Sequence, residues 1–453
     1  MKTLNILLAG ALCLGVAAPV ATAATPEEAA KLKSELTPFG AEKAGNKEGT
    51  IPAWDGGYTT PIPGDKQGGR RGDPFAAEKP LYTITAKNVD QYAAKLTDGV
   101  KAMLRKYPET FKVDVYKTVR TAAAPQWVYD NTFKNATQAK TVKGGDAIEG
   151  AYAGIPFPLP KTGAEVMWNG LLYWRGANWK FHVNQYLITA SGGHVLSTEG
   201  VGDQQSPYYL KDVPPAKWGG EYWMIRLVNS GPPIRAGEAI VGRENVDPDK
   251  TLSWVYLTGQ RRVRKLPVAC CDTPTPTTAG VMSFDEMEVW TGRIDRFDWK
   301  IVGKQEMLIP YNGNRFLQPK KDTEVLIPGQ HHVASDKVRW ELHRVWVVEA
   351  SLRQGKRHQA PKGRYYVDED TWMPVLADRW DANNQLWKTL WRIPVVMPDI
   401  PATVGTSFGY YDLLSGAGYV ANVFNQSDDQ YSIMPTYKDS VFTPDAMAGE
   451  SVR

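Results

Sequence analysis

Segments that alternate apolar and polar residues recur along most of the chain, and they limit the folds open to it. In the segment VRWELHRVWVVEA, Trp340, Leu342 and Trp346 fall on one side of an extended strand. Glu341 and His343 fall on the other side. Because successive side chains of a strand point to opposite faces, this segment predicts a half-buried strand with one solvent-exposed face. The tryptophans need a cover, which is either a protein core or a bound molecule.

The same alternation predicts strands that pair with their neighbours. Residues 252–257 and 261–266 both alternate, and a glycine-containing turn separates them, which is typical of a hairpin. Residues 364–367, 372–380 and 386–391 are separated by turn-forming clusters of Asp and Asn, which predicts an antiparallel meander. The 16 Trp, 21 Tyr, 41 Gly and 32 Pro agree with many short strands joined by turns. We therefore predict a mainly β (α+β) protein whose large curved antiparallel sheet forms a half-open barrel.

Helical patterns concentrate near the start of the chain. Thr25 is a favourable N-cap and Pro26 suits the first helical position, so a short helix is expected there. From Asn88 to Tyr107, apolar residues recur at three- and four-residue steps, which predicts one further helix. We expect these few helices to pack on the concave face of the sheet or to close it.

The first residues have the pattern of an export signal. Lys2 precedes an apolar run, and Ala21-Thr22-Ala23 forms a small-residue cleavage site, so residues 1–23 are predicted to be a secretory signal peptide. Later segments fall short of the roughly 20 apolar residues that cross a bilayer. We expect a soluble protein of the periplasm, with a turn-rich and helical segment at 24–110 and an antiparallel half-barrel at 111–453 that form one structural unit. A net charge of +4 and export both argue against nucleic acid as a partner.

Several long motifs resemble one known family. In chain order they are LTPFGAEKAGNKEGTIPAWDGG at 36–57, GIPFPLPKTGAEVMWN at 154–169, WVYLTGQRRVRKLP at 254–267, DWKIVGKQEMLIPYN at 298–312, RWELHRVWVVEA at 339–350 and YYVDEDTW at 365–372. They resemble the proteobacterial periplasmic family called domain of unknown function 1329, over nearly the whole mature chain. One departure is visible, because Cys271 stands before Asp272 where the family pattern leads us to expect a tyrosine.

The resemblance implies a fold and a class of function. Members of this family look like enlarged relatives of the Lol carriers, which move lipoproteins across the periplasm in a half-open antiparallel barrel closed by helices. They are described as lipoprotein-sorting-like, and as associated with transporters of the resistance-nodulation-division class and with an outer-membrane family. The resemblance thus implies a carrier or accessory protein that passes a hydrophobic or lipid-like ligand between envelope components. An inner-membrane transporter and an outer-membrane protein are the partners that it suggests.

A strongly curved sheet often holds a ligand on its concave face. Aromatic side chains on strands are the candidates for the lining, although a tryptophan on a strand face more often belongs to an ordinary core. The residues that we expect to line the cavity are Trp254, Tyr256, Trp299, Trp340, Trp346 and Trp372. The expected ligand is a hydrophobic small molecule or a lipid, and no cofactor is expected.

Catalytic and metal-binding patterns are weak in this sequence. The six His are scattered without the spacing of a zinc site, so no metal is expected. Nucleophile-elbow, phosphate-loop and dinucleotide motifs do not occur. A dense group of carboxylates fits a solvated loop; its members are Asp285, Glu286, Glu288, Asp295 and Asp298. Aromatics together with acids leave a secreted β-rich hydrolase that acts on carbohydrate as the alternative function.

A cluster of cations lies at the predicted hairpin. We name its members Arg261, Arg262, Arg264 and Lys265 the basic hairpin. Guanidinium groups pair with phosphate and carboxylate, so the basic hairpin is a candidate for docking onto an acidic partner or an anionic membrane. A solvated basic face is the simpler interpretation.

The mature chain has two cysteines, Cys270 and Cys271, which are adjacent. An oxidising compartment favours a disulfide, but adjacent residues close only a strained ring. A vicinal disulfide, a free pair and an intermolecular bridge therefore all stay open.

Overall fold

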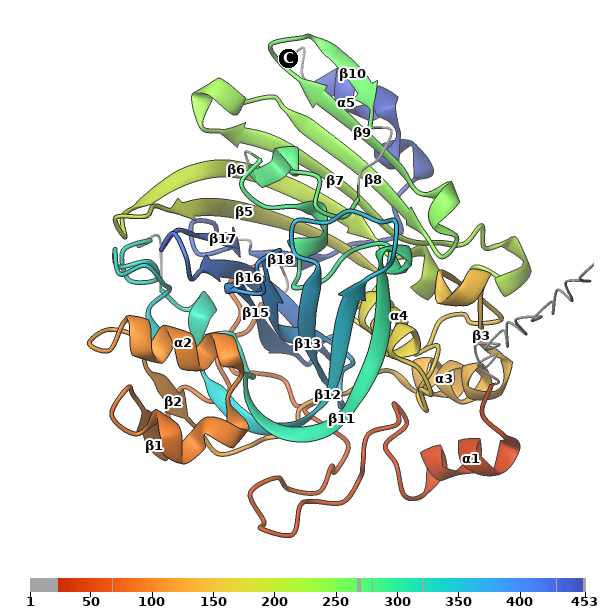
Figure 1. Ribbon diagram of the computed structural model, residues 1–453. Coiled ribbons are helices and arrows are strands. Elements are labelled where there is room, and N and C mark those ends of the chain that lie inside the picture. The colour runs from red at the N-terminus through yellow and green to blue at the C-terminus, as the bar shows by residue number, and fades with distance from the viewer. Residues whose placement is uncertain are drawn as a thin grey trace, which may run out of the picture.

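The structure is a computed structural model of the chain (Figure 1). It describes residues 23–66, 68–266, 270–278, 280–319, 322–428 and 430–450. The predicted signal peptide at 1–23 lies outside the described residues except for Ala23. Among the helices in these ranges, none is long and apolar enough to cross a membrane.

One sheet of 16 strands dominates the molecule. Its strands are β1 (Tyr82–Ile84), β2 (Val113–Val115), β5 (Asn178–Ile188), β6 (His194–Gln205), β7 (Glu221–Gly231), β8 (Ala239–Asn245), β9 (Leu252–Leu257), β10 (Arg262–Lys265), β11 (Phe297–Pro310), β12 (Trp340–Leu352), β13 (Lys362–Asp368), β14 (Pro374–Trp380), β15 (Leu386–Met397), β16 (Ala402–Asp412), β17 (Gly418–Val423) and β18 (Tyr431–Ile433). A separate hairpin joins β3 (Lys140–Val142) to β4 (Ala147–Glu149).

The strand order places the two ends of the sheet far apart in sequence. It runs β1-β2-β12-β13-β14-β15-β16-β17-β5-β6-β7-β8-β9-β10, with β11 beside β12 and β18 beside β5. Pairing is antiparallel apart from a parallel contact between Trp340 of β12 and Val115 of β2. Within the described residues β1 and β10 do not pair with each other, so the sheet stays open. In Figure 1, β5–β10 lie above the strongly curved β11 and β12. The predicted large, curved, half-open antiparallel sheet is confirmed.

The local strand predictions agree with this topology. The hairpin has β9 and β10 in antiparallel register, with Arg262 opposite Leu257. The meander consists of β13, β14 and β15, which are antiparallel neighbours in that order. The segment at 24–110 contributes β1, whose pairing with β2 extends the same sheet. The division of the mature chain at residue 110 stays a prediction.

The helices differ more from expectation. They are α1 (Pro26–Ala30), α2 (Asp98–Lys106), α3 (Gln126–Gln138), α4 (Gly163–Leu171) and α5 (Pro444–Glu450). The expected N-terminal helix is present, and Thr25 caps it. The helix predicted from Asn88 to Tyr107 is interrupted: a 3-10 segment ends at Lys95, and α2 begins after Thr97, whose hydroxyl accepts a hydrogen bond from the backbone NH of Val100. α3, α4 and α5 were not predicted.

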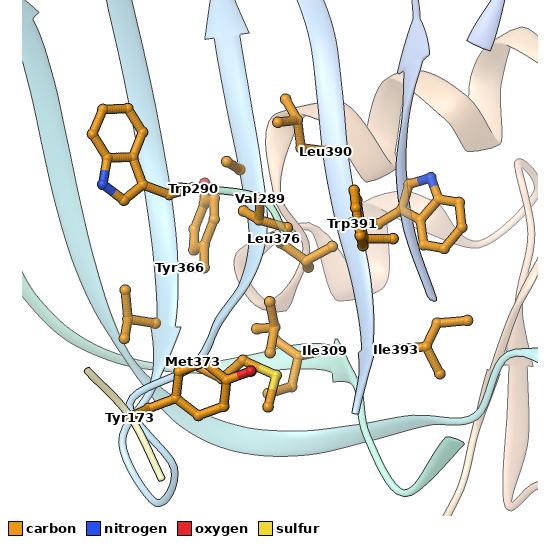
Figure 2. Packing of buried hydrophobic residues seen from close by; sticks show 14 of the residues in the cluster. Tyr173, Val289, Trp290, Ile309, Tyr366, Met373, Leu376, Leu390, Trp391 and Ile393 are labelled. Carbon is orange, nitrogen blue, oxygen red and sulfur yellow. The ribbon is translucent and has the colours of Figure 1, made fainter. Parts of the chain in front are cut away.

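Both faces of β12 are buried in the core. The prediction that one face of this strand is exposed to solvent is therefore wrong. Figure 2 shows part of the core, with Ile309 from β11, Leu376 from β14 and Trp391 from β15. Glu341 and His343 are also buried, because partners from distant segments cover them. The Glu341 carboxylate accepts hydrogen bonds from the Asn312 side chain and the Val119 backbone. Buried charge of this kind requires such partners.

Candidate ligand-binding cavity

A large cavity lies between β5–β9 and the strands β16–β18, and residues 270–293 form one of its walls. We call residues 270–293 the inner segment; residue 279 within it lies outside the described ranges. The cavity holds about 1440 Å³ of space between atoms, part of which is continuous with solvent. Its apolar lining consists of Phe181, Ile225, Leu227, Ile240, Leu266, Phe284, Met287, Phe408 and Phe424. Concave sites with mostly apolar walls and a few polar groups are typical of small-molecule sites.

Buried ion pairs hold the inner segment against the sheet. The Asp285 carboxylate lies 3.1 Å from Nη1 of Arg379 and 2.7 Å from Nε2 of His358. Burial disfavours ionisation of Asp285, but Arg379 and His358 outweigh burial and hold the pKa of its carboxyl well below the usual range. Glu286 lies 2.6 Å from Nζ of Lys388. The prediction that these acids belong to a solvated loop is therefore wrong for Asp285 and Glu286.

Glu288, which also lines the cavity, is held by two cations. Its carboxylate lies 2.6 Å from Nη1 of Arg175 and 2.8 Å from Nη2 of Arg392. Burial would raise the pKa of Glu288, but the two guanidinium groups lower it. The interpretation as a solvated loop is wrong for Glu288 too. These contacts join the inner segment to β15 and to the chain between α4 and β5.

Glu244 of β8 also lines the cavity, and within the described residues no cation forms an ion pair with it. Burial raises the pKa of its carboxyl to about 7, and a hydrogen bond from the Thr251 hydroxyl at 3.3 Å opposes that rise only in part. At neutral pH this wall of the cavity thus carries a partly protonated acid.

Two of the aromatic residues predicted to line a cavity lie on the far side of the sheet. Trp254 and Tyr256 of β9 pack in a cluster that includes Phe442 and Met447, near the C-terminal helix α5. Ser253, which is adjacent in β9, points to the cavity. Because neighbouring side chains of a strand alternate between faces, Trp254 and Ser253 lie on opposite faces.

The other four predicted residues lie in the main hydrophobic core or pack against it. The Trp299 ring lies 4.8 Å from that of Trp290, and the rings of Trp346 and Trp372 stack at 5.9 Å. Trp340 lines a second, smaller apolar cavity beside α2, together with Trp391. None of the six predicted residues is among those that line the large cavity. Ligand contact by these residues stays a prediction.

Sequence reasoning missed the residues that do line the cavity. Ile225 and Leu227 in β7 and Ile240 in β8 face it. Apolar and polar residues alternate in these segments, which is a signal for strands. The sequence does not distinguish a medium-sized aliphatic residue that faces a core from one that faces a cavity. The emphasis on tryptophan selected residues that mostly fill the core.

A buried polar cluster near β12 has the spacing of a metal site. His343, Asp368 and Asp370 each offer one ligand atom, and these atoms lie within 4.8 Å of one another. Protein groups already occupy much of the cluster: Nε2 of His343 lies 3.1 Å from Glu341, and Arg120 donates two hydrogen bonds to Asp370. The Arg120 guanidinium thus balances part of the carboxylate charge of this cluster. We interpret the cluster as a structural ion-pair network.

Comparison with known proteins identifies the family. A sequence profile of DUF1329, described as a protein of unknown function, matches residues 83–448. The chain belongs to the DUF1329 family. It is 39% identical, over 461 aligned residues that cover 100% of both chains, to a protein of Pseudomonas aeruginosa named uncharacterized protein PA3922.

Solved structures with similar parts include another DUF1329 protein. The DUF1329 family protein of Desulfovibrio piger aligns with a TM-score of 0.40 and 14% identity, over 60% of this chain and 92% of its own. A putative outer membrane lipoprotein-sorting protein domain of Vibrio parahaemolyticus aligns with 0.41 and 11%, over 60% and 92%. The LolA superfamily protein NE2245 of Nitrosomonas europaea aligns with 0.36 and 12%, over 63% and 100%.

This DUF1329 protein has an adjacent pair of cysteines at the edge of the cavity. Cys270 and Cys271 are joined by a disulfide in the structure, and Cys270 lines the cavity wall. Nε of Arg296 lies 3.1 Å from the sulfur of Cys271, the residue that stands in place of the expected tyrosine. The redox state of this pair in solution stays a prediction.

The basic hairpin of this DUF1329 protein lies at the end of the sheet. Its four side chains are exposed, and β10 is the last strand of the order. Among the described strands β10 pairs only with β9, and α5 lies next to both strands. Docking through these residues stays a prediction.

Proposed function

We propose that this protein is a periplasmic carrier or accessory protein that binds a hydrophobic or lipid-like ligand and passes it between envelope transport components. The observation that carries this proposal is the large cavity with mostly apolar walls, enclosed by one curved sheet and the inner segment. Burial of apolar surface contributes roughly 25 cal/mol per Å². A ligand that buries about 300 Å² would gain about 7 kcal/mol before the cost of ordering.

The ion pairs of the inner segment explain why the cavity does not simply collapse. Asp285, Glu286 and Glu288 attach the segment to cations of the sheet. Such pairs depend on geometry, so they fix the distance between the segment and the strands. Apolar contacts alone would favour closer packing.

The proposed location and partners rest on other features. The sequence of residues 1–23 predicts export to the periplasm. The basic hairpin is exposed and offers donors for phosphate or carboxylate, so we propose it as the docking surface for an acidic transport partner. Electrostatic attraction of this kind chiefly increases the rate of association.

A cavity-filling substitution tests the proposed function. Gly242 lines the cavity, and an added Cβ there would lie 3.4 Å from the nearest side-chain atom, so a larger residue extends into the cavity without a severe clash. A lipophilic fluorescent dye should bind the wild type saturably and bind Gly242→Leu at least about tenfold more weakly.

Gly259→Leu is the matched control, because a Cβ there meets no heavy atom within 4 Å. This variant should bind the dye like the wild type. Absence of saturable dye binding to the wild type would contradict the proposed function.

The alternative is a secreted hydrolase, and one observation favours it. Glu244 with a raised pKa and Glu288 with a lowered pKa both line the cavity, which resembles the acid and base pair of glycoside hydrolysis. The carrier is the better conclusion because two guanidinium groups already bind Glu288 and because the walls are mainly apolar. Release of sugar from glycans by the wild type, abolished in Glu244→Gln, would reverse this choice.

A further inference from the structure

We infer that the ligand carries a neutral oxygen group, a carbonyl or a hydroxyl, on its apolar body, and that Gln204 and Trp223 donate hydrogen bonds to this oxygen. The inference rests on the proposed function and specifies its ligand. It concerns one corner of the large cavity, where β6, β7 and β8 lie side by side.

The strand register brings the relevant side chains together. Gln204 of β6 lies opposite Ile225 of β7, and Trp223 lies opposite Glu244 of β8. Positions two residues apart in a strand share a face, so Trp223 and Ile225 point the same way. Gln204 and Trp223 are therefore diagonal neighbours on the cavity side, and both line the cavity.

Both side chains present hydrogen-bond donors that lack partners. Nε2 of Gln204 and Nε1 of Trp223 are buried, and neither has a hydrogen-bond partner in the part of the chain that the structure describes. A buried donor left unpaired costs about 1–3 kcal/mol. Two such donors at one corner of a cavity indicate that a ligand atom accepts from them.

Other indoles of the protein show the contrast. Trp174 and Trp179 direct Nε1 to backbone carbonyls, at 2.9 Å and 2.7 Å. The indoles of Trp290, Trp346 and Trp391 also lack partners among the described residues, but none of the three lines the large cavity, and Trp391 lines the second, smaller one instead. Trp223 thus combines an unpaired donor with a place in the cavity wall.

The surrounding charges favour a neutral acceptor over an anion. Glu244 faces Trp223 across the strands and, within the described residues, it forms no ion pair. A carboxylate or phosphate group beside it would meet like charge. Arg293, a cation in the cavity wall, opposes the burial-raised pKa of Glu244 only in part, and it is already paired with Asp295 at 3.1 Å and with Asp249 at 3.4 Å. A ketone, an ester or an alcohol avoids this repulsion and satisfies both donors.

The apolar part of the ligand has its place next to this corner. Ile225, Leu227 and Ile240 continue along the same face of β7 and β8, and Phe284 and Met287 of the inner segment also line the cavity. The cavity is thus matched to an amphipathic molecule with one oxygen-bearing end.

Competition by three probes with the same chain length tests the inference. Dodecane, 2-dodecanone and dodecanoate are each titrated against the bound lipophilic dye at pH 8. In the wild type, 2-dodecanone should compete about tenfold better than dodecane, and dodecanoate should compete less well than the ketone. Trp223→Phe removes the indole donor and Gln204→Met removes the amide donor, so each should reduce the preference for the ketone over dodecane several-fold.

Trp218→Phe is the matched control, because this indole donates to the Glu221 carbonyl at 2.6 Å and does not line the cavity. It should keep the preference for the ketone. Equal competition by ketone and dodecane, a preference for dodecanoate, or an unchanged preference in both donor variants would overturn the inference. Failure of the dye itself to bind the wild type would instead contradict the proposed function. Saturable dye binding by a variant shows that it has kept a folded cavity.

Discussion

Asp285→Asn should destabilise the protein strongly, because this carboxylate anchors the inner segment. Asp285 is fully buried and is paired with Arg379 and His358, which are also buried. Asn keeps the shape but removes the charge, and it leaves the buried Arg379 guanidinium with only the more distant Glu286 carboxylate, at 3.9 Å. Removal of one partner from a buried ion pair costs about 3–5 kcal/mol. We expect a loss of this size in the free energy of unfolding at pH 7.

The same substitution predicts a pH dependence. Because the folded pKa of Asp285 is depressed, its stabilisation is present above the unfolded pKa of about 3.9 and is lost as the pH falls below it. The stability difference between wild type and Asp285→Asn should therefore persist above pH 5 and should decrease as the pH falls below 4.

Urea unfolding followed by tryptophan fluorescence measures this difference as the midpoint shift multiplied by the slope. The matched control is Asp298→Asn, since the Asp298 side chain is 76% exposed and pairs with Arg353 at the surface. Exposed pairs contribute about 0–1 kcal/mol. If Asp285→Asn destabilises no more than Asp298→Asn, the inner segment is not anchored by this ion pair.

Three further predictions concern other charged or reactive groups. Glu244→Gln should stabilise the protein by up to about 3 kcal/mol at pH 8 and by less than about 1 kcal/mol at pH 5. The reason is that ionising the buried Glu244 carboxyl destabilises the folded protein increasingly as the pH rises from about 4.5 to about 7. Equal effects at both pH values in urea unfolding would refute this. Reversal of all four charges of the basic hairpin should abolish docking to its acidic partner in a salt-sensitive binding assay and leave dye binding intact. Full complementation of transport in cells by the charge-reversed protein would contradict the docking proposal. Mass measurement after alkylation without reductant should find Cys270 and Cys271 unmodified, whereas two added alkyl groups would show a free pair.

The sequence predicted best those structural elements whose signals lie within a few consecutive residues. The hairpin β9–β10 and the meander β13–β15 follow from alternation and from turn residues, which act over a few positions. The helix α4 also had a local signal that was overlooked, because Thr162 and Glu165 form a capping box. These elements belong to the part of a fold that a single sequence can specify.

The incorrect prediction of a solvent-exposed face for β12 shows what a strand pattern does not reveal. Alternation placed Glu341 and His343 on one face correctly, but polarity alone suggested solvent. Their partners Val119, Asn312 and Asp368 come from distant segments that the strand pattern does not indicate. Pairing across such distances decides whether a charge is buried, and one sequence does not show it.

The cavity was beyond sequence reasoning for a similar reason. Its existence follows from the curvature of the sheet and from the ion pairs of the inner segment, both of which depend on the assembled fold. Large aromatic residues such as Trp254 and Trp372 fit a core as well as a cavity wall. The family resemblance pointed to a carrier but not to the residues that line its cavity.

The central claim is that the protein carries a hydrophobic molecule in the large cavity. Native mass spectrometry of the protein purified from its native host, followed by organic extraction, tests this claim most directly. The account predicts a bound mass that is released into the organic phase and identified as an apolar molecule with a neutral oxygen group, and it predicts loss of this mass in Gly242→Leu. A wild-type protein with no bound mass, or a mass that Gly242→Leu retains in full, would contradict it.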